Sequence, residues 1–238
     1  AGLGELHAIV GENLGIDGGS LFFGSAANAA ERTFAPLSVL LVENSGLTPQ
    51  RTPGWPDDAF LRGDVPMTKQ EVRAAALAKL GVKPADTVWD VGAGTGSVSV
   101  ELALAAPRGH VYAVECAPDA CDLIRKNREK FRAYNLTLLE GRAPEALAAL
   151  PAPDAVFIGG TKGSMAAVVD AVLAKNPDAR ICISAIALET MSAAVTALTA
   201  RGLAAEVAQI AVSRTRPAGQ LHLLMANNPV FLITGERR

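Results

Sequence analysis

Asp90-Val91-Gly92-Ala93-Gly94-Thr95-Gly96 is the stretch that decides how this chain folds. It follows a short apolar run typical of a buried strand and precedes a helical pattern, so it predicts a sharp turn from a strand into a helix. Glycines permit that turn and let a ligand approach where a Cβ atom would collide. A dinucleotide-binding fold would prefer Gly-x-Gly-x-x-Gly around a pyrophosphate. The observed Gly-x-Gly-x-Gly after an acidic residue favours an adenosyl ligand that has no phosphate and a positively charged amino-acid end.

A second acidic residue, Glu115, ends the next strand pattern, 23 positions after Gly92. A carboxylate about 20 residues beyond such a turn can accept hydrogen bonds from both ribose hydroxyls of a nucleoside. The alternative is that residues 92–96 are only a tight connection and that Glu115 is a solvated strand end. We prefer the nucleoside site, because both acids and all three glycines lie where that ligand needs them.

Outward from the turn, apolar strand patterns alternate with helical patterns. The strands are apolar throughout, which is typical of parallel strands covered by helices on both faces of a doubly wound α/β sheet. Strands are predicted at 87–91, 110–114, 136–139, 155–158 and 181–184, and helices at 96–106, 118–132, 143–150, 162–175 and 188–201. Strand-like runs at 206–213 and 220–225, joined by residues 214–219, and a further run at 230–233 predict an antiparallel hairpin at the end of the sheet.

Upstream of this block, Thr68-Lys69-Gln70-Glu71 has the pattern of a capping box, in which the Thr68 hydroxyl and the Glu71 carboxylate satisfy each other's backbone N–H groups. It predicts a helix over 69–80 that stops at Gly81. Its apolar stripe is Val72, Ala76, Leu77 and Leu80.

Composition excludes several classes. The 238 residues are 50% apolar and 19% charged, with a formal net charge of −2, which argues against a general binder of nucleic acid or anionic membranes. Apolar runs are shorter than the ~18 residues of a membrane span, and the first residues lack a leader pattern, so we expect a cytoplasmic protein. Cys116, Cys121 and Cys182 fit neither a disulfide framework nor a zinc spacing, and we expect reduced thiols and no metal.

The N-terminal part is short. Residues 6–10, 24–33 and 37–43 predict a strand, a helix and a strand, and the proline- and glycine-containing stretch 45–56 predicts a linker. About 40 residues are too few for a secure independent core, so this piece is interpreted as the tail of another domain.

At the glycine turn and Glu115 the sequence resembles class I S-adenosylmethionine-dependent methyltransferases, over about residues 64–234. The resemblance implies a Rossmann-like, doubly wound, seven-stranded sheet with an antiparallel terminal hairpin. Within that class the chain resembles the decarboxylating precorrin methyltransferases of cobalamin (vitamin B12) biosynthesis. The matching motifs are Val65–Arg73, Glu140–Ala146, Phe157–Gly160, Ala187–Thr190 and Asn228–Val230.

Near the N-terminus, Glu12–Gly15 and Phe34–Val39 resemble the end of a tetrapyrrole methylase domain, which precedes the decarboxylating half in fused enzymes of this family. We therefore expect residues 1–46 to be the C-terminal remnant of such a domain, 47–56 a linker, and 57–238 the class I methyltransferase domain.

The resemblance also implies roles in binding S-adenosylmethionine. The backbone of Gly92, Gly94 and Gly96 would cradle its methionine end, Asp90 would shape that turn, and Glu115 would hold the ribose. Thr68 would lie against the methionine end, although a helix cap alone also explains it. Cys116 would flank the adenine, and the turn at Arg142 and Ala143 would contact it through the Ala143 backbone.

A tetrapyrrole with many carboxylates would need cations at the mouth of the site. The candidates are Lys69, Arg73, Lys162, Arg214 and Arg216, and each could instead be an ordinary solvated charge. Glu189 is a candidate active-site residue by its place in the family motif, and the chemistry of a helix start explains it equally well. His222 lies in a strand pattern and is interpreted as a structural histidine.

The expected reaction is methylation at carbon 15 of a precorrin-6-type ring coupled to loss of the ring C acetate as carbon dioxide, with S-adenosylhomocysteine as product. The family resemblance further implies a homotetramer. The alternatives are a class I methyltransferase acting on another small molecule or on RNA, and a non-enzymatic nucleotide-binding subunit. Strand four ends Phe157-Ile158-Gly159-Gly160 and lacks the Asn/Asp-Pro-Pro-Tyr type of tetrad that amino-group methylation often uses.

Overall fold

A computed structural model describes residues 4–43 and 53–237. The chain divides into two compact units, residues 1–50 and 51–238, and each is described by itself. Most of the predicted linker, residues 47–52, lies outside the described residues. In the part of the chain that is described, no helix is long and apolar enough to cross a membrane.

The N-terminal unit is a small antiparallel sheet with one short helix. Its elements are β1 (His7–Glu12), β2 (Ser20–Ser25), α1 (Ala26–Ala30) and β3 (Ser38–Glu43), and the strand order is β2-β1-β3. The sequence predicted β1, α1 and β3 but missed β2. Residues 20–25 pair with β1 along their whole length in antiparallel register, and residues 13–19 connect the two strands.

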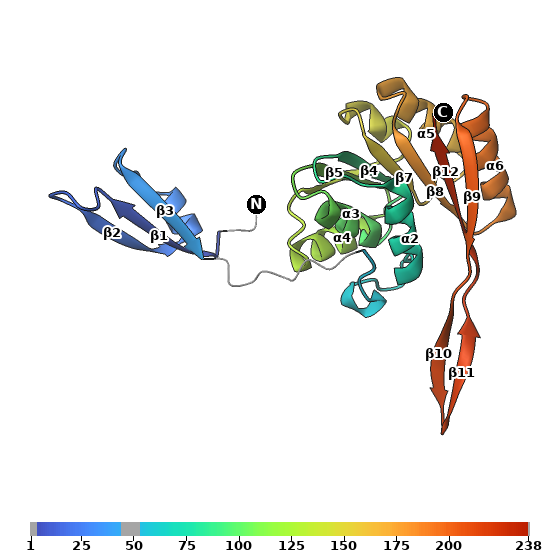
Figure 1. Cartoon of the computed structure of the whole chain (residues 1–238), viewed down its shortest axis with the longest axis horizontal. Coiled ribbons are helices and arrows are strands. Elements are labelled where there is room, and N and C mark those ends of the chain that lie inside the picture. Colours follow the sequence, from blue (N-terminus) through green and yellow to red (C-terminus); the bar gives the residue numbers. More distant parts are fainter. Residues whose placement is uncertain (1–3, 44–52, 238) are drawn as a thin grey trace. The chain divides into compact units, whose positions relative to one another are not determined.

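The larger unit is built on one seven-stranded sheet. Its order is β6-β5-β4-β7-β8-β12-β9, with the first five strands parallel and β12 antiparallel to both of its neighbours. The predicted doubly wound, seven-stranded α/β fold is confirmed (Figure 1). The strands are β4 (Thr87–Val91), β5 (His110–Glu115), β6 (Leu136–Glu140), β7 (Ala155–Ile158), β8 (Arg180–Ala185), β9 (Ala204–Ile210) and β12 (Val230–Glu236).

Helices cover both faces of this sheet, as the uninterrupted apolar strands require. Along β4, Val88 packs into the core of one face and Trp89 into the core of the other, and both side chains are fully buried. The first face carries α2 (Gln70–Leu80), α3 (Ser97–Ala105) and α4 (Pro118–Lys130), and the second carries η2 (Glu145–Ala149), α5 (Met165–Lys175) and α6 (Leu188–Thr199) (Figure 1).

The strand order reverses between β4 and β7. Strands β5 and β6 extend the sheet on one side of β4, and β7 and β8 extend it on the other. In doubly wound sheets the loops at such a switch point diverge to opposite faces, which leaves a crevice at the carboxyl ends of the strands. The turn 92–96 lies at the carboxyl end of β4 and therefore opens into this crevice.

The predicted antiparallel terminal hairpin is confirmed, but the predicted pairing of its strands is wrong. Strand β9 pairs with β12 inside the sheet, whereas β10 (Ser213–Ala218) and β11 (Leu221–Ala226) pair with each other as a separate two-stranded hairpin. Residues 214–218, predicted as a connection, belong to β10. Figure 1 shows this hairpin projecting from the unit beyond the end of β9 and β12. The apolar pattern identified strand-forming segments, but it contained no information on which segment pairs with which.

The predicted capping box of α2 is also wrong. Lys69 is the N-cap residue, without a side-chain cap, and the Gln70 N–H donates instead to Asp57 Oδ1 at 2.9 Å. Asp57 opens the 3₁₀ turn η1 (Asp57–Ala59), so the cap comes from 13 residues upstream. The predicted end is confirmed, because Gly81 takes a left-handed conformation at φ 55°.

Arg73, predicted to face the substrate, is a fully buried structural residue. Its Nε donates to Glu101 Oε1 at 2.7 Å, and its Nη1 donates to Asp57 Oδ1 at 2.8 Å. The guanidinium also lies over the Phe60 ring, 4.6 Å from the ring centre. The prediction assumed that Arg73, one helical turn after Lys69, faces the same way as Lys69. In the structure the Arg73 side chain instead points towards Glu101 of α3.

We expect Arg73→Ala to destabilise the protein by about 3–5 kcal/mol, because it leaves the buried Glu101 carboxylate without its charge partner. Arg125→Ala is the control, since Arg125 pairs with carboxylates while 46% of its side chain is exposed; it should cost less than about 1 kcal/mol. Urea unfolding of both variants measures the difference. Equal midpoints for the two variants would contradict a structural role for Arg73.

Candidate functional site

A cavity of about 1290 Å³ lies at the carboxyl ends of β4, β5, β7 and β8. Its wall includes the glycine turn after β4, Glu115 at the end of β5, Gly159 and Gly160 after β7, and Ser184 at the end of β8. The segment Gly63–Lys69 and Asn227–Asn228 also belong to it. Most pockets for small ligands measure about 300–1,000 Å³, so this cavity is larger than the usual range.

The glycine turn needs its glycines. Gly92 has φ 74°, and a Cβ atom placed on it would lie 2.4 Å from the Gly160 carbonyl oxygen. The Gly92 and Ala93 N–H groups donate to the Val114 carbonyl at 2.9 and 3.2 Å. These bonds hold the turn against the end of β5, and the backbone of Gly92 and Gly94 forms part of the cavity wall.

Glu115 contacts the glycine turn directly. Gly94 N–H donates to its Oε2 at 2.9 Å, and the N–H groups of Cys116 and Ala117 donate to its Oε1 at 2.7 and 2.9 Å. Burial alone would raise the pKa of Glu115, but the backbone donors from Ala117, Gly94 and Cys116 outweigh it and hold that pKa below its usual range. An ionised carboxylate is therefore maintained at the cavity wall, where it can accept hydrogen bonds.

Asp90 presents a second, different carboxyl group. It is buried beneath the turn, and Ser99 Oγ donates to its Oδ2. Desolvation raises the pKa of Asp90 to about 7, with a further contribution from the nearby negative Glu115. Among the described residues, Asp90 Oδ1 and Thr95 Oγ1 are buried atoms of the cavity wall that have no hydrogen-bond partner. Such atoms are expected to find partners, so both fit the polar, cationic end of an amino-acid ligand.

Of the predicted cations, Lys69 and Lys162 line the cavity. Lys69 is half-buried at the start of α2, and Lys162 is exposed on the loop after β7. Lys162 has φ 47°, a left-handed conformation that is uncommon outside glycine and that clusters at functional sites. Thr68 also lines the cavity, next to Lys69.

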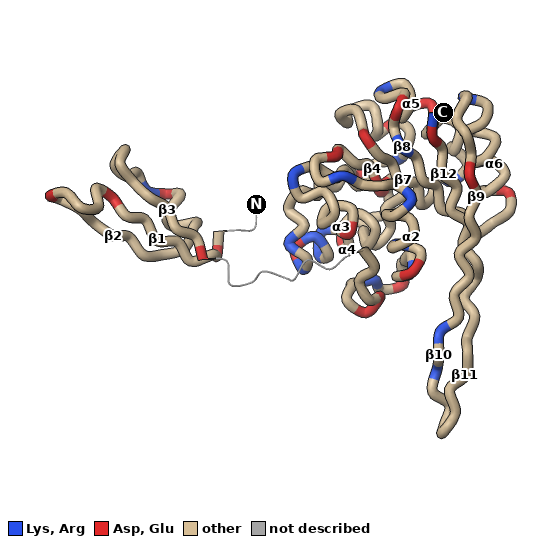
Figure 2. The backbone as a smooth tube through the Cα atoms, in the orientation of Figure 1, with Lys and Arg blue, Asp and Glu red and all other residues tan. Residues whose placement is uncertain are grey.

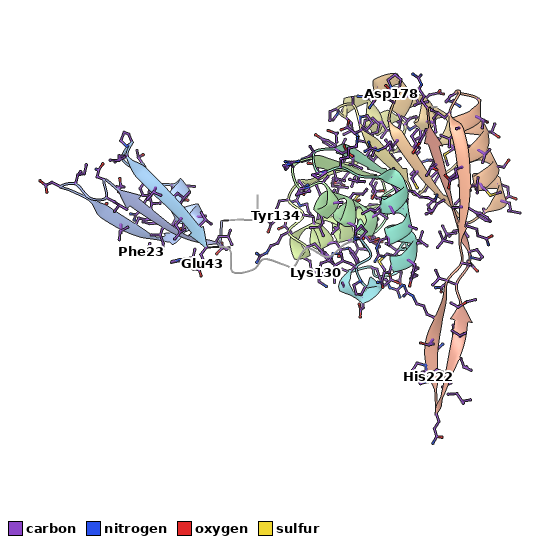
Figure 3. All side chains as sticks on the ribbon, in the orientation of Figure 1. Phe23, Glu43, Lys130, Tyr134, Asp178 and His222 are labelled. Carbon is purple, nitrogen blue, oxygen red and sulfur yellow. The ribbon has the colours of Figure 1, made fainter. Side chains whose placement is uncertain are left out.

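Arg214 and Arg216, also predicted as substrate cations, do not line the cavity. Arg214 is ion-paired with Asp57 and Glu71, which neutralise its charge. Arg216 is exposed on the hairpin. In Figure 2 the charged positions of the hairpin lie on β10, and β11 carries none. His222, expected as a structural histidine, is instead an exposed residue of β11, visible near the end of the hairpin in Figure 3.

Five other predicted residues lie outside the cavity wall, and one of them, Gly96, is buried at the start of α3. Cys116 and Arg142 are exposed, and Ala143 is half-buried with its carbonyl accepting from Ser164 Oγ at 3.3 Å. Glu189 is exposed in the first turn of α6, where the helix dipole favours a negative charge. Its neighbour Thr190 does line the cavity.

The sequence analysis missed a polar stripe on α4. Asp119, Asp122, Leu123 and Lys126 all line the cavity. Their spacing of three, one and three residues places them on one face of α4, which begins three residues after Glu115. This spacing could have been recognised, because the helix after the second strand must start beside Glu115. No group of His, Cys, Asp or Glu in the described part of the chain is arranged to hold a metal ion.

The strand order, the glycine turn at the switch point and the adjoining carboxylate together define a Rossmann-like methyltransferase of the S-adenosylmethionine-dependent class. Residues 58–237 match the family described as "Precorrin methyltransferase domain", and the chain belongs to that family.

The chain is also similar to individual proteins and solved structures of known name. A Salmonella typhimurium protein named cobalt-precorrin-6B C(15)-methyltransferase (decarboxylating) is 40% identical over 184 residues, which cover 76% of this chain and 95% of that protein. A crystal structure of precorrin-6y C5,15-methyltransferase from Geobacter metallireducens is 38% identical, with a TM-score of 0.76 over 80% of this chain and all of that one. The C-terminal domain of precorrin-6Y C5,15-methyltransferase from Rhodobacter capsulatus is 33% identical, with a TM-score of 0.70 and the same coverages.

The raised pKa of Asp90 predicts a pH-dependent stability. An unfolded aspartate ionises near pH 4, whereas the folded one keeps its proton to about pH 7, so the stability of the ligand-free protein falls between these values. Asp90→Asn removes this titration. The stability gained by the variant should therefore grow from pH 5 to pH 8, measured by thermal unfolding. A gain that stays constant across this range would show that Asp90 is ionised throughout.

Proposed function

We propose that this chain transfers a methyl group from S-adenosylmethionine to carbon 15 of a precorrin-6-type tetrapyrrole and removes carbon dioxide from the ring C acetate. The observation that carries this proposal is a single cavity in which the glycine turn and Glu115 adjoin Lys69 and Lys162. Membership of the precorrin methyltransferase family supports it, as does the name of the Salmonella typhimurium relative.

The cofactor end of the cavity is assigned to residues whose chemistry fits. Asp90 Oδ1 and Thr95 Oγ1 would bind the amino-acid end beside the backbone of Gly92 and Gly94, and Gly96 would complete the turn beneath them. Glu115 would accept from the ribose hydroxyls, exchanging its bond with Gly94 for them. Thr68, Cys116, Arg142 and Ala143 remain proposed neighbours of the cofactor. When bound, S-adenosylmethionine supplies a methyl group already activated by the sulfonium.

The protein therefore needs mainly to orient the substrate and the cofactor, because the methyl group is already activated. Holding the ring carbon in line with the methyl group can supply several kcal/mol, on the order of 7–11 for well-aligned groups. Lys69 and Lys162 would bind substrate carboxylates as point charges, which sets the position of the ring in the cavity. Arg73, Arg214, Arg216 and Glu189 are left out of this assignment, because none of them lines the cavity.

Decarboxylation requires the electrons of the breaking carbon–carbon bond to flow into the adjoining π system. A cation near that system stabilises the charge that develops there. Lys162 fits this role, since it is exposed at the cavity wall and held in a left-handed conformation after the Gly159-Gly160 pair.

Glu115→Gln tests the cofactor site. Loss of a charge-assisted acceptor should weaken S-adenosylmethionine binding about 10- to 100-fold, because such bonds contribute about 1.5–3 kcal/mol. Glu140→Gln is the control. Glu140 ends the neighbouring strand β6, in register with Glu115, but it is exposed and pairs with Arg125. Isothermal titration calorimetry of both variants decides the matter. A folded wild-type protein that binds no S-adenosylmethionine would defeat the proposal.

Lys162→Ala tests the substrate site. It should lower kcat/KM for the tetrapyrrole about 10- to 100-fold and leave the affinity for S-adenosylmethionine unchanged. Lys83→Ala, at an exposed position outside the cavity wall, is the matched control and should change neither value.

Mass spectrometry of a precorrin-6 substrate incubated with S-adenosylmethionine identifies the reaction. We expect a gain of one methyl group and a loss of one carbon dioxide. Methylation of RNA or of another small molecule would support the alternative methyltransferases. Normal cofactor binding with no transfer to any tetrapyrrole would indicate a non-enzymatic subunit.

We further propose a homotetramer, a fused tetrapyrrole methylase domain and a cytoplasmic location. The hairpin supports assembly, since the exposed fractions of Leu221, Leu223 and Leu224 are 67%, 48% and 71%, as in apolar contact surfaces. The fused domain is supported by the methylase-like motifs at 12–15 and 34–39. Native mass spectrometry measures the assembly.

A further inference from the structure

The segment Gly63–Lys69, here called the pocket strap, forms part of the cavity wall along its whole length. It lies against the glycine turn. A Cβ atom added to Gly94 would be 3.4 Å from the Pro66 carbonyl oxygen and 4.0 Å from Val65 Cγ1. The position of the strap therefore sets how much room remains above the turn.

Before the strap, the chain is fixed by Asn127 of α4, which is fully buried. Its Oδ1 accepts from Leu61 N–H at 2.8 Å, and its Nδ2 donates to the Leu61 carbonyl at 2.8 Å and to the Thr95 carbonyl at 2.9 Å. This end of the strap is thereby joined to the glycine turn itself.

At its other end, the strap is fixed by Arg73. Arg73 Nη1 donates to the Thr68 carbonyl, and the same nitrogen donates to Asp57 Oδ1 at 2.8 Å. Asp57 Oδ1 also accepts from the Gln70 N–H, which begins α2. Asp57 thus orients both the guanidinium that holds Thr68 and the helix that follows the strap.

The second carboxylate oxygen of Asp57 accepts a hydrogen bond from the β10–β11 hairpin. Arg214 Nη1 donates to Asp57 Oδ2 at 2.9 Å, while Arg214 Nε and Nη2 donate to the two oxygens of Glu71 at 3.1 and 2.6 Å. Burial would raise the pKa of Asp57, but the hydrogen bonds and charges of Arg73 and Arg214 lower it, so the bridge stays ionised. Isolated surface ion pairs contribute little to stability. An arginine that forms two parallel hydrogen bonds to a carboxylate within a network contributes more.

We propose that Asp57 and Arg214 are positioning residues of the cofactor site, through which the base of the β10–β11 hairpin holds the pocket strap against the glycine turn. Neither residue lines the cavity. They act through Arg73 and Thr68, so the placement of the hairpin and the affinity for the cofactor are linked. This inference rests on the proposed function, since it takes S-adenosylmethionine as the ligand of that site.

Arg214→Ala tests the link, with Arg216→Ala as the control from the same strand, two residues on. Arg214 forms ion pairs, and Arg216 has none among the described residues. Titration calorimetry with S-adenosylmethionine should show about 3- to 30-fold weaker binding for Arg214→Ala, the range of couplings through packed networks, and no change for Arg216→Ala. Hydrogen exchange of peptides covering 62–69 should accelerate in Arg214→Ala alone, while exchange in α3 stays as in the wild type.

A merely structural ion pair would lower the melting temperature of Arg214→Ala and leave the affinity unchanged, and that result overturns the inference. The double variant Asp57→Asn/Arg214→Ala adds a second criterion. We expect Arg214→Ala to weaken binding less in the Asp57→Asn background than alone, because the partner is already lost. Full additivity would place the effect of Arg214 elsewhere and overturn the inference. Failure of the wild type to bind S-adenosylmethionine would instead defeat the proposed function.

Discussion

The hydrogen bonds from Gly92 and Ala93 to the Val114 carbonyl are the constraint on which the site depends. They join the turn after β4 to the end of β5, at the point where the strand order reverses. Glu115, the next residue along β5, is thereby brought within hydrogen-bond distance of Gly94. A side chain on Gly92 would meet the Gly160 backbone, so the turn can approach the loop after β7 this closely only because it is built from glycine.

Two carboxyl groups in this crevice are kept in different states by their surroundings. Backbone N–H donors surround Glu115 and favour its ionised form, whereas Asp90 is enclosed beneath the turn and its pKa is raised to about 7. A ligand with a cationic amino-acid end would stabilise the ionised Asp90. Stability of the free protein is thus reduced at the place where binding is proposed, as expected of a functional site.

Positive charge is divided between two tasks. Arg73 is buried and Arg214 is paired, and both hold parts of the structure together, while Lys69 and Lys162 remain at the cavity wall for an anionic substrate. Arginine suits the first task because its planar fork satisfies several fixed acceptors at once, and lysine suits a point contact with a carboxylate. The low net charge of the chain is compatible with an anion site because the cations that matter are few and local.

The sequence by itself determined the doubly wound sheet, the glycine turn, Glu115 and the apolar stripe of α2, because these depend on local periodicity and on residues close together along the chain. Only the tertiary structure decided that Asp57 caps α2, that Arg73 and Arg214 share that carboxylate, and that β9 pairs with β12. Arg214 lies 157 residues from Asp57, and no local pattern records which distant segments meet. The stripe on α4 lies between these two cases. Its helical spacing can be read from the sequence, but only the fold shows that this face of α4 lines the same cavity as Glu115.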